Sequence, residues 1–310
     1  MTRVLTTRTV RVVLDYLHPW PNSAGLFVAR DRGWYAQAGL DVELRVHDYS
    51  WGDTLEYLSR GRAEFGLFPP NRLLVRRERG ERLVAVAAVN HEGLEAVQVA
   101  AKSGVERPRD LAGRRVGYAP TPRGRALLAG IVAADGGDPA PVVTVDTGAA
   151  ELTPEFLTAS GLDATFGGYW SWDALTADPV AAEQTLVWPM REVAPTRYHS
   201  YVLGAPETLA EADPDLVRAF LAATSRGYAA AAAEPDLTVD LLSRVTPYVP
   251  SWRLARSLSL VIPTWFHDGT WGQLRADLVA GYADFLAGHG ILTAPQAWAG
   301  AITTEFLPLR

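Results

Sequence analysis

The 310-residue chain contains no cysteine, and its one lysine is Lys102. The missing cysteine excludes disulfides, thiolate metal sites and cysteine nucleophiles. Lys102 lies in the polar stretch AAKSGVERP, which is typical of an exposed turn. An enzyme that binds pyridoxal through an internal aldimine needs a buried, activated lysine, so we do not expect that class.

Basic charge and long apolar runs are also scarce. The formal net charge is −6, whereas nucleic acids and anionic membranes require a basic surface, so we expect neither as a partner. No run of about 18 apolar residues exists, so no transmembrane helix is expected. The opening stretch MTRVLTTRTVRVVLDY lacks an apolar signal region and a lipoprotein cysteine. We expect a cytoplasmic location for the sequence as given, and an extracytoplasmic one if a leader has been removed.

What the chain does contain is strands alternating with helices, which predicts an α/β fold with largely parallel sheets. The first unit is a strand through VRVVLDY, a loop over 17–23, and a helix over about 24–38 that ends at Gly39. We expect one lobe from residues 1–93 and 202–310, and a second from 94–201. The pattern from about 202 onward is helical. Such a layout predicts a ligand cleft between two lobes, at loops that leave the carboxyl ends of strands.

The loops after the predicted strands combine aromatic rings with carboxylates and amides. Flat rings with a few polar groups suit a planar heteroaromatic ligand, because rings stack and polar groups bind its edge. Arg123, at a predicted helix start, suits an anionic group. The candidate ligand-binding residues are Asp15, Tyr16, His18, Trp20, Asn22, Trp51, Phe68, Asn71, Tyr118, Arg123, Tyr169, Trp170, Trp172, Asp173 and Tyr198.

Each candidate also has a plain structural explanation, since any single ring here fits core packing. We interpret His91, His267 and His289 as structural, and the run RRERGER at 76–82 as a solvated helix end. The chain has no HExxH or GxSxG motif, and no GxGxxG follows a strand. No His/Asp/Glu cluster has metal-ligand spacing, so neither a metal nor a cofactor is expected.

An ordered set of motifs then points to a family. LDY…NSAGLFVARDRGWYAQAGLDVEL, LSRGRAEFGL, DLAGRRVGY, LDATFGGYWSWD, PTRYHSYVL and DPDLVRAFLAATSRGY occur in this order, followed by WGQLRADLVAGYADFLAGHGIL…TTEFLP. Together they resemble the thiamine-pyrimidine-precursor family of bacterial formylaminopyrimidine-binding proteins and fungal hydroxymethylpyrimidine phosphate synthases. The resemblance spans nearly the whole chain and implies the periplasmic-binding-protein type 2 fold, with two lobes and a helical C-terminal tail.

The chain departs from these relatives at several functional positions. Ser171 and Asp173 stand where the binding proteins have asparagine and glutamate, and Ser23 stands in place of a histidine. Asn71 lies roughly where the synthases have the histidine that supplies substrate atoms, so we do not expect that reaction. The loop LHPWPN also resembles the nucleophile loop of aromatic sulfinate desulfinases, with His18 in the position of their cysteine.

These observations favour a protein that binds a small pyrimidine-like heteroaromatic, as the substrate-binding components of ABC transporters do, with a permease as partner if the protein is exported. One alternative is a cytoplasmic enzyme on the same fold, in cofactor-related or specialised metabolism with lyase- or hydrolase-type chemistry, in which His18 or His199 is the acid/base. A weaker alternative is an intracellular sensing domain.

Overall fold

The computed structural model describes residues 7–308, and it divides into two compact units. Unit 1 comprises residues up to His91, His199–Ala283 and Leu292 onward, and unit 2 comprises Glu92–Tyr198 and Asp284–Ile291. The sequence-based division kept the segment from 202 to the C-terminus in one lobe, whereas the structure assigns 284–291 to unit 2. The location was predicted from the opening stretch of the sequence. Residues 1–6 of that stretch lie outside the described residues.

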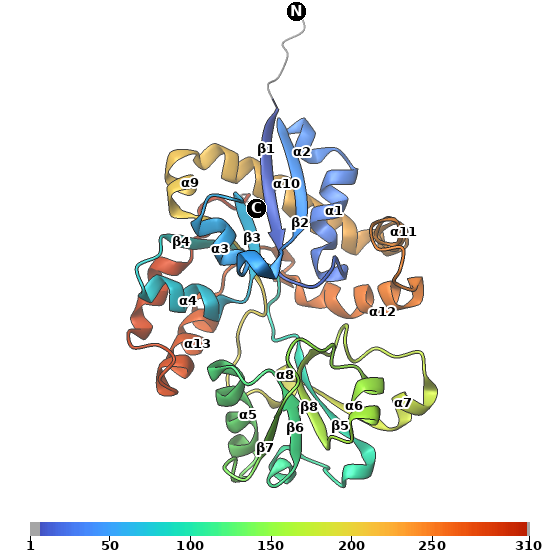
Figure 1. The fold of residues 1–310 in the computed structure, drawn as a ribbon. Helices are drawn as coiled ribbons and strands as arrows, with labels where there is room; N and C mark the ends of the chain where they lie inside the picture. Colours follow the sequence, from blue (N-terminus) through green and yellow to red (C-terminus); the bar gives the residue numbers. More distant parts are fainter. Residues whose placement is uncertain (1–6, 309–310) are drawn as a thin grey trace, which may run out of the picture. The chain divides into compact units, whose positions relative to one another are not determined.

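Unit 1 is built on a five-stranded sheet of order β2-β1-β3-β10-β4 (Figure 1). β1 pairs in parallel with β2 and β3, whereas β10 is antiparallel to β3 and β4. The prediction of a helical segment from 202 missed β10, and the sheet is mixed rather than largely parallel. The strands are β1 (Arg8–Leu14), β2 (Leu40–Val46), β3 (Phe65–Phe68), β4 (Leu83–Ala88) and β10 (Val202–Pro206).

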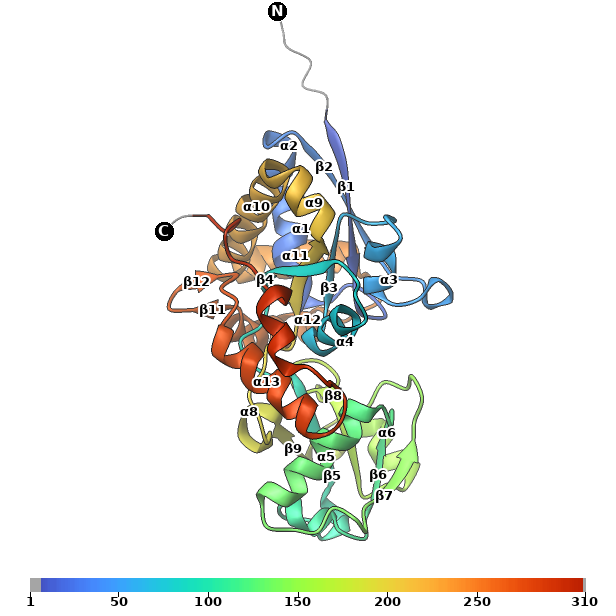
Figure 2. The ribbon, with the colours of Figure 1, turned by 90° about the vertical axis from the view of Figure 1, so that its left-hand side faces the viewer.

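Helices cover both faces of this sheet. Phe65 of β3 stacks on Phe220 at 4.0 Å between ring centroids, while a Cβ at the next residue, Gly66, would meet Thr54. Consecutive strand residues face opposite sides, so the helices carrying Phe220 and Thr54, α10 and α3, lie on opposite faces (Figure 2). The helices are α1 (Ala24–Asp31), α2 (Trp34–Gln37), α3 (Thr54–Ser59), α4 (Pro70–Glu78), α9 (Glu207–Ala212), α10 (Pro214–Ala233), α11 (Pro235–Val245) and α12 (Ser251–Val261).

The last part of the chain adds a short hairpin, β11 (Phe266–His267) and β12 (Thr270–Trp271), and helix α13 (Ala276–Gly288). The single helix predicted over 24–38 is two helices, because Gly33 between α1 and α2 has a φ of +70°. The predicted left-handed end at Gly39 is confirmed by its φ of +76°. None of the helices within 7–308 is long and apolar enough to cross a bilayer.

Unit 2 contains a second five-stranded sheet, of order β7-β6-β8-β5-β9. β6 is parallel to β7 and β8, and β5 is antiparallel to β8 and β9. Its strands are β5 (Glu95–Ala100), β6 (Arg115–Tyr118), β7 (Val143–Asp146), β8 (Ala164–Tyr169) and β9 (Thr185–Pro189). Its helices are α5 (Pro122–Ala134), α6 (Pro154–Ser160), α7 (Pro179–Glu183) and α8 (Met190–Val193).

Candidate functional site

A pocket lies in unit 1, where the chain leaves the carboxyl end of β1. Its empty space is about 240 Å³ when the open mouth of the pocket is counted. The lining residues come from the β1 loop, from β3 and from the segment before β10: Leu14, Asp15, Tyr16, His18, Trp20, Asn22, Ser23, Leu67 and Tyr201.

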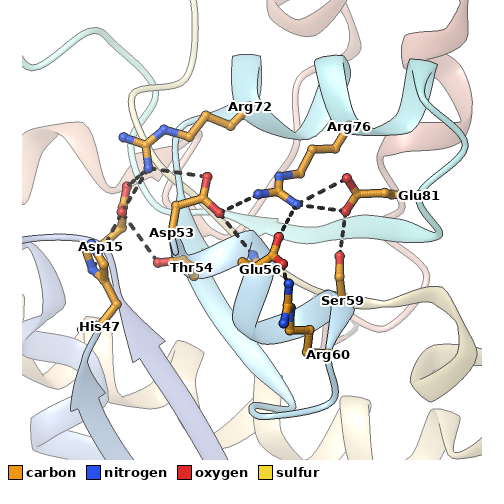
Figure 3. A network of polar contacts seen from close by, with 10 residues as sticks. All are labelled: Asp15, His47, Asp53, Thr54, Glu56, Ser59, Arg60, Arg72, Arg76 and Glu81. Atoms are coloured by element: carbon orange, nitrogen blue, oxygen red, sulfur yellow. Dashed lines mark hydrogen bonds and ion pairs between the residues drawn. The ribbon is translucent and has the colours of Figure 1, made fainter. Parts of the chain in front are cut away.

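Asp15 is the charged residue in this lining, and its side chain is only 5% exposed. One guanidinium nitrogen of Arg72, on α4, donates to both carboxylate oxygens at 3.0 Å (Figure 3). The Thr54 hydroxyl lies 3.5 Å from one of these oxygens, and His47 Nδ1 lies 3.9 Å from it. Burial raises the pKa of Asp15 even though Arg72 lowers it, because removal from water disfavours the charged form.

Rings form much of the remaining wall. Tyr16 is partly buried, and its ring lies 5.2 Å from the ring of His18 and 5.5 Å from the ring of Trp20. His18 also approaches Tyr248, whose ring lies 6.0 Å away, and its Nδ1 is 2.8 Å from the Pro19 carbonyl oxygen. Edge-to-face arrangements at these distances are favourable between aromatic rings. The β1 loop therefore presents several rings beside one carboxylate.

Asn22 lines the pocket but its side chain is hydrogen-bonded within the protein. Its Nδ2 donates to Asn90 Oδ1 at 3.1 Å, and its Oδ1 accepts from Asn90 Nδ2 at 2.8 Å and from Trp265 Nε1 at 3.2 Å. Its backbone carbonyl accepts from the Tyr228 hydroxyl at 2.8 Å. Asn22 therefore ties the pocket loop to three other segments of unit 1.

The acidic and basic side chains beside Asp15 continue as a network along α3 and α4 (Figure 3). Arg76 donates to Asp53 at 2.8 Å, to Glu56 at 3.1 Å and to Glu81 at 3.0 Å. The interpretation of 76–82 as a solvated helix end is wrong for Arg76, because its side chain is only 19% exposed. This network joins α3 and α4 behind the pocket.

The other candidates in unit 1 lie elsewhere. Phe68 is completely buried in the sheet, where a Cβ on Gly204 of β10 would meet its ring. Trp51 is 52% exposed and stacks with Tyr57, and the Arg62 guanidinium lies 4.0 Å from the centre of its ring. Asn71 is partly buried in the first turn of α4, with an Oδ1 that makes no hydrogen bond. None of these three lines the pocket.

Both ring nitrogens of His199 make contacts within the protein. Its Nδ1 lies 2.8 Å from the Asn90 carbonyl oxygen, and its Nε2 accepts from the Arg275 backbone N–H at 3.1 Å. Burial lowers the pKa of His199 to about 4. His91, with a pKa lowered by burial to about 3, packs its ring 5.2 Å from His199 and 5.5 Å from His267. His91 and His199 are buried, whereas His267 is only partly buried.

In unit 2, Arg123 is paired with an acid of the protein itself. It donates to Glu95 at 2.6 Å, and its guanidinium lies 5.1 Å from the centre of the Tyr198 ring. The Tyr198 hydroxyl donates to the second Glu95 oxygen at 3.0 Å. The Thr121 hydroxyl caps α5, because it accepts from the Gly124 N–H at 3.0 Å. Glu95, which the sequence did not single out, therefore holds both of these candidates.

The remaining unit 2 candidates are mostly interior. Trp172 is fully buried, and Tyr118 is 3% exposed with its hydroxyl 3.2 Å from that of Thr144. Trp170 donates through Nε1 to the Gly93 carbonyl at 3.2 Å and lies under Arg191. Asp173 accepts from the backbone N–H of Tyr169 at 2.6 Å. Asp173 and Trp170 therefore stabilise the chain at the end of β8.

Among the residues that sequence reasoning did not single out for the site, Tyr201 and Arg72 contact Asp15 directly. Tyr201 lines the pocket, and its hydroxyl donates to the Asp15 carbonyl at 2.9 Å. Arg72 was not singled out either, although it stands next to the candidate Asn71 in the first turn of α4. Within the described residues, no group of three His, Asp or Glu side chains is placed to hold a metal ion.

Known proteins resemble this chain in sequence and in fold. It is 28% identical over 236 residues to the formylaminopyrimidine-binding protein of Halalkalibacterium halodurans, covering 76% of this chain and 69% of that protein. The periplasmic aliphatic sulphonate binding protein SsuA from Escherichia coli superposes with a TM-score of 0.72 at 16% identity, over 98% of this chain and 94% of SsuA. The desulfurization enzyme DSZB superposes with a TM-score of 0.65 at 18% identity, over 96% of this chain and 97% of that one.

At such identities the two structural matches establish the fold alone, and they confirm the predicted α/β periplasmic-binding-protein architecture. The ligand cleft between lobes stays a prediction. The model of the family described as NMT1/THI5 like matches residues 20–238, which is most of the chain. The family resemblance seen in the sequence motifs is confirmed, and the chain belongs to the NMT1/THI5-like family.

Proposed function

We propose that the protein binds a small, planar, pyrimidine-like heteroaromatic and serves as a substrate-binding protein, with a thiamine pyrimidine precursor as the first candidate ligand. The observation that carries the proposal is the unit 1 pocket, whose lining includes the aromatic residues Tyr16, Trp20 and Tyr201 together with Asp15. A flat heterocycle gains from stacking on such rings, while a few polar groups read its edge.

The sequence relative named for formylaminopyrimidine binding supports this ligand class. The structural likeness to SsuA supports a role as the binding component of an importer, with a permease as partner. The replacement of family residues by Ser171 and Asp173 shortens two polar side chains, so the ligand that fits best need not be the pyrimidine of the relatives.

A thermal-shift screen tests the ligand class. Thiamine pyrimidines, flavins and pyridoxal compounds would be compared with saturated ring compounds of similar size. We expect the melting temperature to rise with at least one planar heterocycle, since a ligand that binds only the folded state stabilises it. The absence of a shift with every planar heterocycle would contradict the proposal.

The enzyme alternative named His18 or His199 as the acid/base, and of these only His18 lines the pocket. Both ring nitrogens of His199 are occupied within the protein. We therefore place binding ahead of turnover. Mass spectrometry of the best ligand after prolonged incubation separates the two, because binding leaves the mass unchanged whereas lyase or hydrolase chemistry changes it.

A further inference from the structure

The pocket lining contains an acidic residue, Asp15, and no lysine or arginine. Arg72 does reach the Asp15 carboxylate from α4, but it does so through a single nitrogen. A carboxylate offers about four acceptor positions, so Asp15 has the capacity to accept a further strong donor.

The positive charge of Arg72 lowers the pKa of Asp15 by less than burial raises it. The pKa of this carboxyl is therefore raised, and the nearby Asp53 raises it further. A second positive charge placed beside Asp15 would stabilise its ionised form. The pocket is therefore electrostatically suited to a cation and unsuited to an anion.

The rings beside Asp15 favour the same kind of ligand. Tyr16, Trp20 and Tyr201 line the pocket together with Asp15. Aromatic rings attract cations through their electron-rich faces, and tryptophan and tyrosine do so best. A carboxylate and several rings around one small pocket combine the two attractive terms for a charged nitrogen.

We propose that the ligand carries a positively charged nitrogen, such as a primary or quaternary ammonium group, that binds against Asp15 and the rings of Tyr16 and Trp20. This inference rests on the proposed function and adds to it a charge that the ligand must bear. It assigns Asp15 the part of specificity determinant, with Arg72 holding the carboxylate in position.

Matched ligands on the unsubstituted protein test the inference by calorimetric titration at pH 7.5. 5-Aminomethylpyrimidine, 5-hydroxymethylpyrimidine and pyrimidine-5-carboxylate differ in charge on one ring, and benzyltrimethylammonium carries a cation without a heterocycle. We expect the aminomethyl compound to bind about tenfold more tightly than the hydroxymethyl compound, as a charge-assisted hydrogen bond provides, and the carboxylate to bind most weakly.

Two carboxylate variants refine the test. Asp15→Asn should remove the preference for the aminomethyl compound, so that the variant binds the aminomethyl and hydroxymethyl compounds with affinities within about threefold of each other. Asp53→Asn is the matched control, because Asp53 belongs to the same network but does not line the pocket, and it should keep the preference. If Asp15→Asn fails to fold, the ligand series on the unsubstituted protein still decides.

The outcomes separate the two claims. Equal or tighter binding of the neutral or anionic pyrimidine would overturn the inference and leave the proposed function standing. Binding of benzyltrimethylammonium without any of the pyrimidines would support the cation site and contradict the heteroaromatic ligand. Binding of none of the four compounds would overturn both.

Discussion

At the scale of single residues, Asn22 has the largest structural role in the candidate site. Replacement by alanine would leave Asn90 Oδ1 and Trp265 Nε1 buried without their partner. Buried groups left unsatisfied cost about 1–3 kcal/mol each, so we expect Asn22→Ala to lower the free energy of unfolding by about 2–4 kcal/mol in urea titrations. The matched control is Asn71→Ala, whose Oδ1 has no partner to lose. A loss for Asn71→Ala as large as that for Asn22→Ala would contradict this account.

The pH dependence of stability tests the buried histidines. The folded protein keeps His199 neutral with a pKa of about 4, whereas an unfolded histidine has a pKa of about 6.5. The stabilising contribution is therefore complete above about pH 6.5 and is lost as the pH falls toward 4. Between pH 7 and 4.5 this amounts to about 2 kcal/mol.

Urea unfolding at pH 7, 5.5 and 4.5 measures this contribution when His199→Gln is compared with the unsubstituted protein. The variant should be less stable at pH 7 but should lose about 2 kcal/mol less on acidification. Asp15, whose pKa is raised, acts in the opposite direction but is present in both proteins, so it cancels. Parallel profiles for the two proteins would show that His199 does not titrate as described.

Some of the site residues could be predicted from the sequence, and others could not. The concentration of rings and polar groups at 15–22 predicted the pocket loop, because that loop follows directly from the first strand. Phe68 and Trp172 also stand at strand ends, yet they are completely buried. A ring at a strand end has the same local pattern whether it faces a pocket or the core. Arg72 was missed because its partner, Asp15, lies 57 residues away in sequence.

At the scale of elements, the packing of α1 against α10 depends on two glycines. A Cβ on Gly227 of α10 would lie 2.0 Å from the Gly25 carbonyl oxygen, and a Cβ on Gly25 would lie 2.3 Å from the Tyr228 ring. Since the first clash is with backbone, we expect Gly227→Ala to reduce the free energy of unfolding by about 3 kcal/mol or more.

Gly281→Ala on α13 is the matched control, because nothing lies within 4 Å of a Cβ at that position. Alanine is favoured over glycine in a helix by up to about 1 kcal/mol, so this variant should be as stable as the original or more so. Guanidinium unfolding followed by circular dichroism gives both values. A Gly227→Ala protein of unchanged stability would refute the close helix contact.

The elements themselves were largely predictable from local signals. Asp213, directly before Pro214, caps α10 by accepting from the Leu216 N–H at 3.0 Å, and Gly80 after α4 has a φ of +87°. β10 was missed because its five residues enter between β3 and β4 through pairing with strands more than a hundred residues earlier. Only long-range pairing identifies such a strand, and it also makes the sheet mixed.

At the scale of the whole molecule, the chain contains two α/β units, each with its own five-stranded mixed sheet. Family membership followed from motifs in order along most of the chain, since each motif marks a turn, cap or strand end that the fold reuses. Ligand identity could not follow in the same way. It depends on which polar atoms remain available in the pocket, and residues such as Asn90 and Tyr201 that decide this are distant in sequence.

The most direct test of the central claim is a calorimetric titration of the best planar heterocycle into the unsubstituted protein, Tyr16→Ala and Trp51→Ala. Tyr16 lines the pocket, whereas Trp51 is an exposed ring outside it. Base–aromatic stacking contributes about 1–3 kcal/mol, so Tyr16→Ala should weaken binding by about tenfold or more, and Trp51→Ala should leave it unchanged. Equal affinity of the unsubstituted protein and Tyr16→Ala would contradict a ligand site in this pocket.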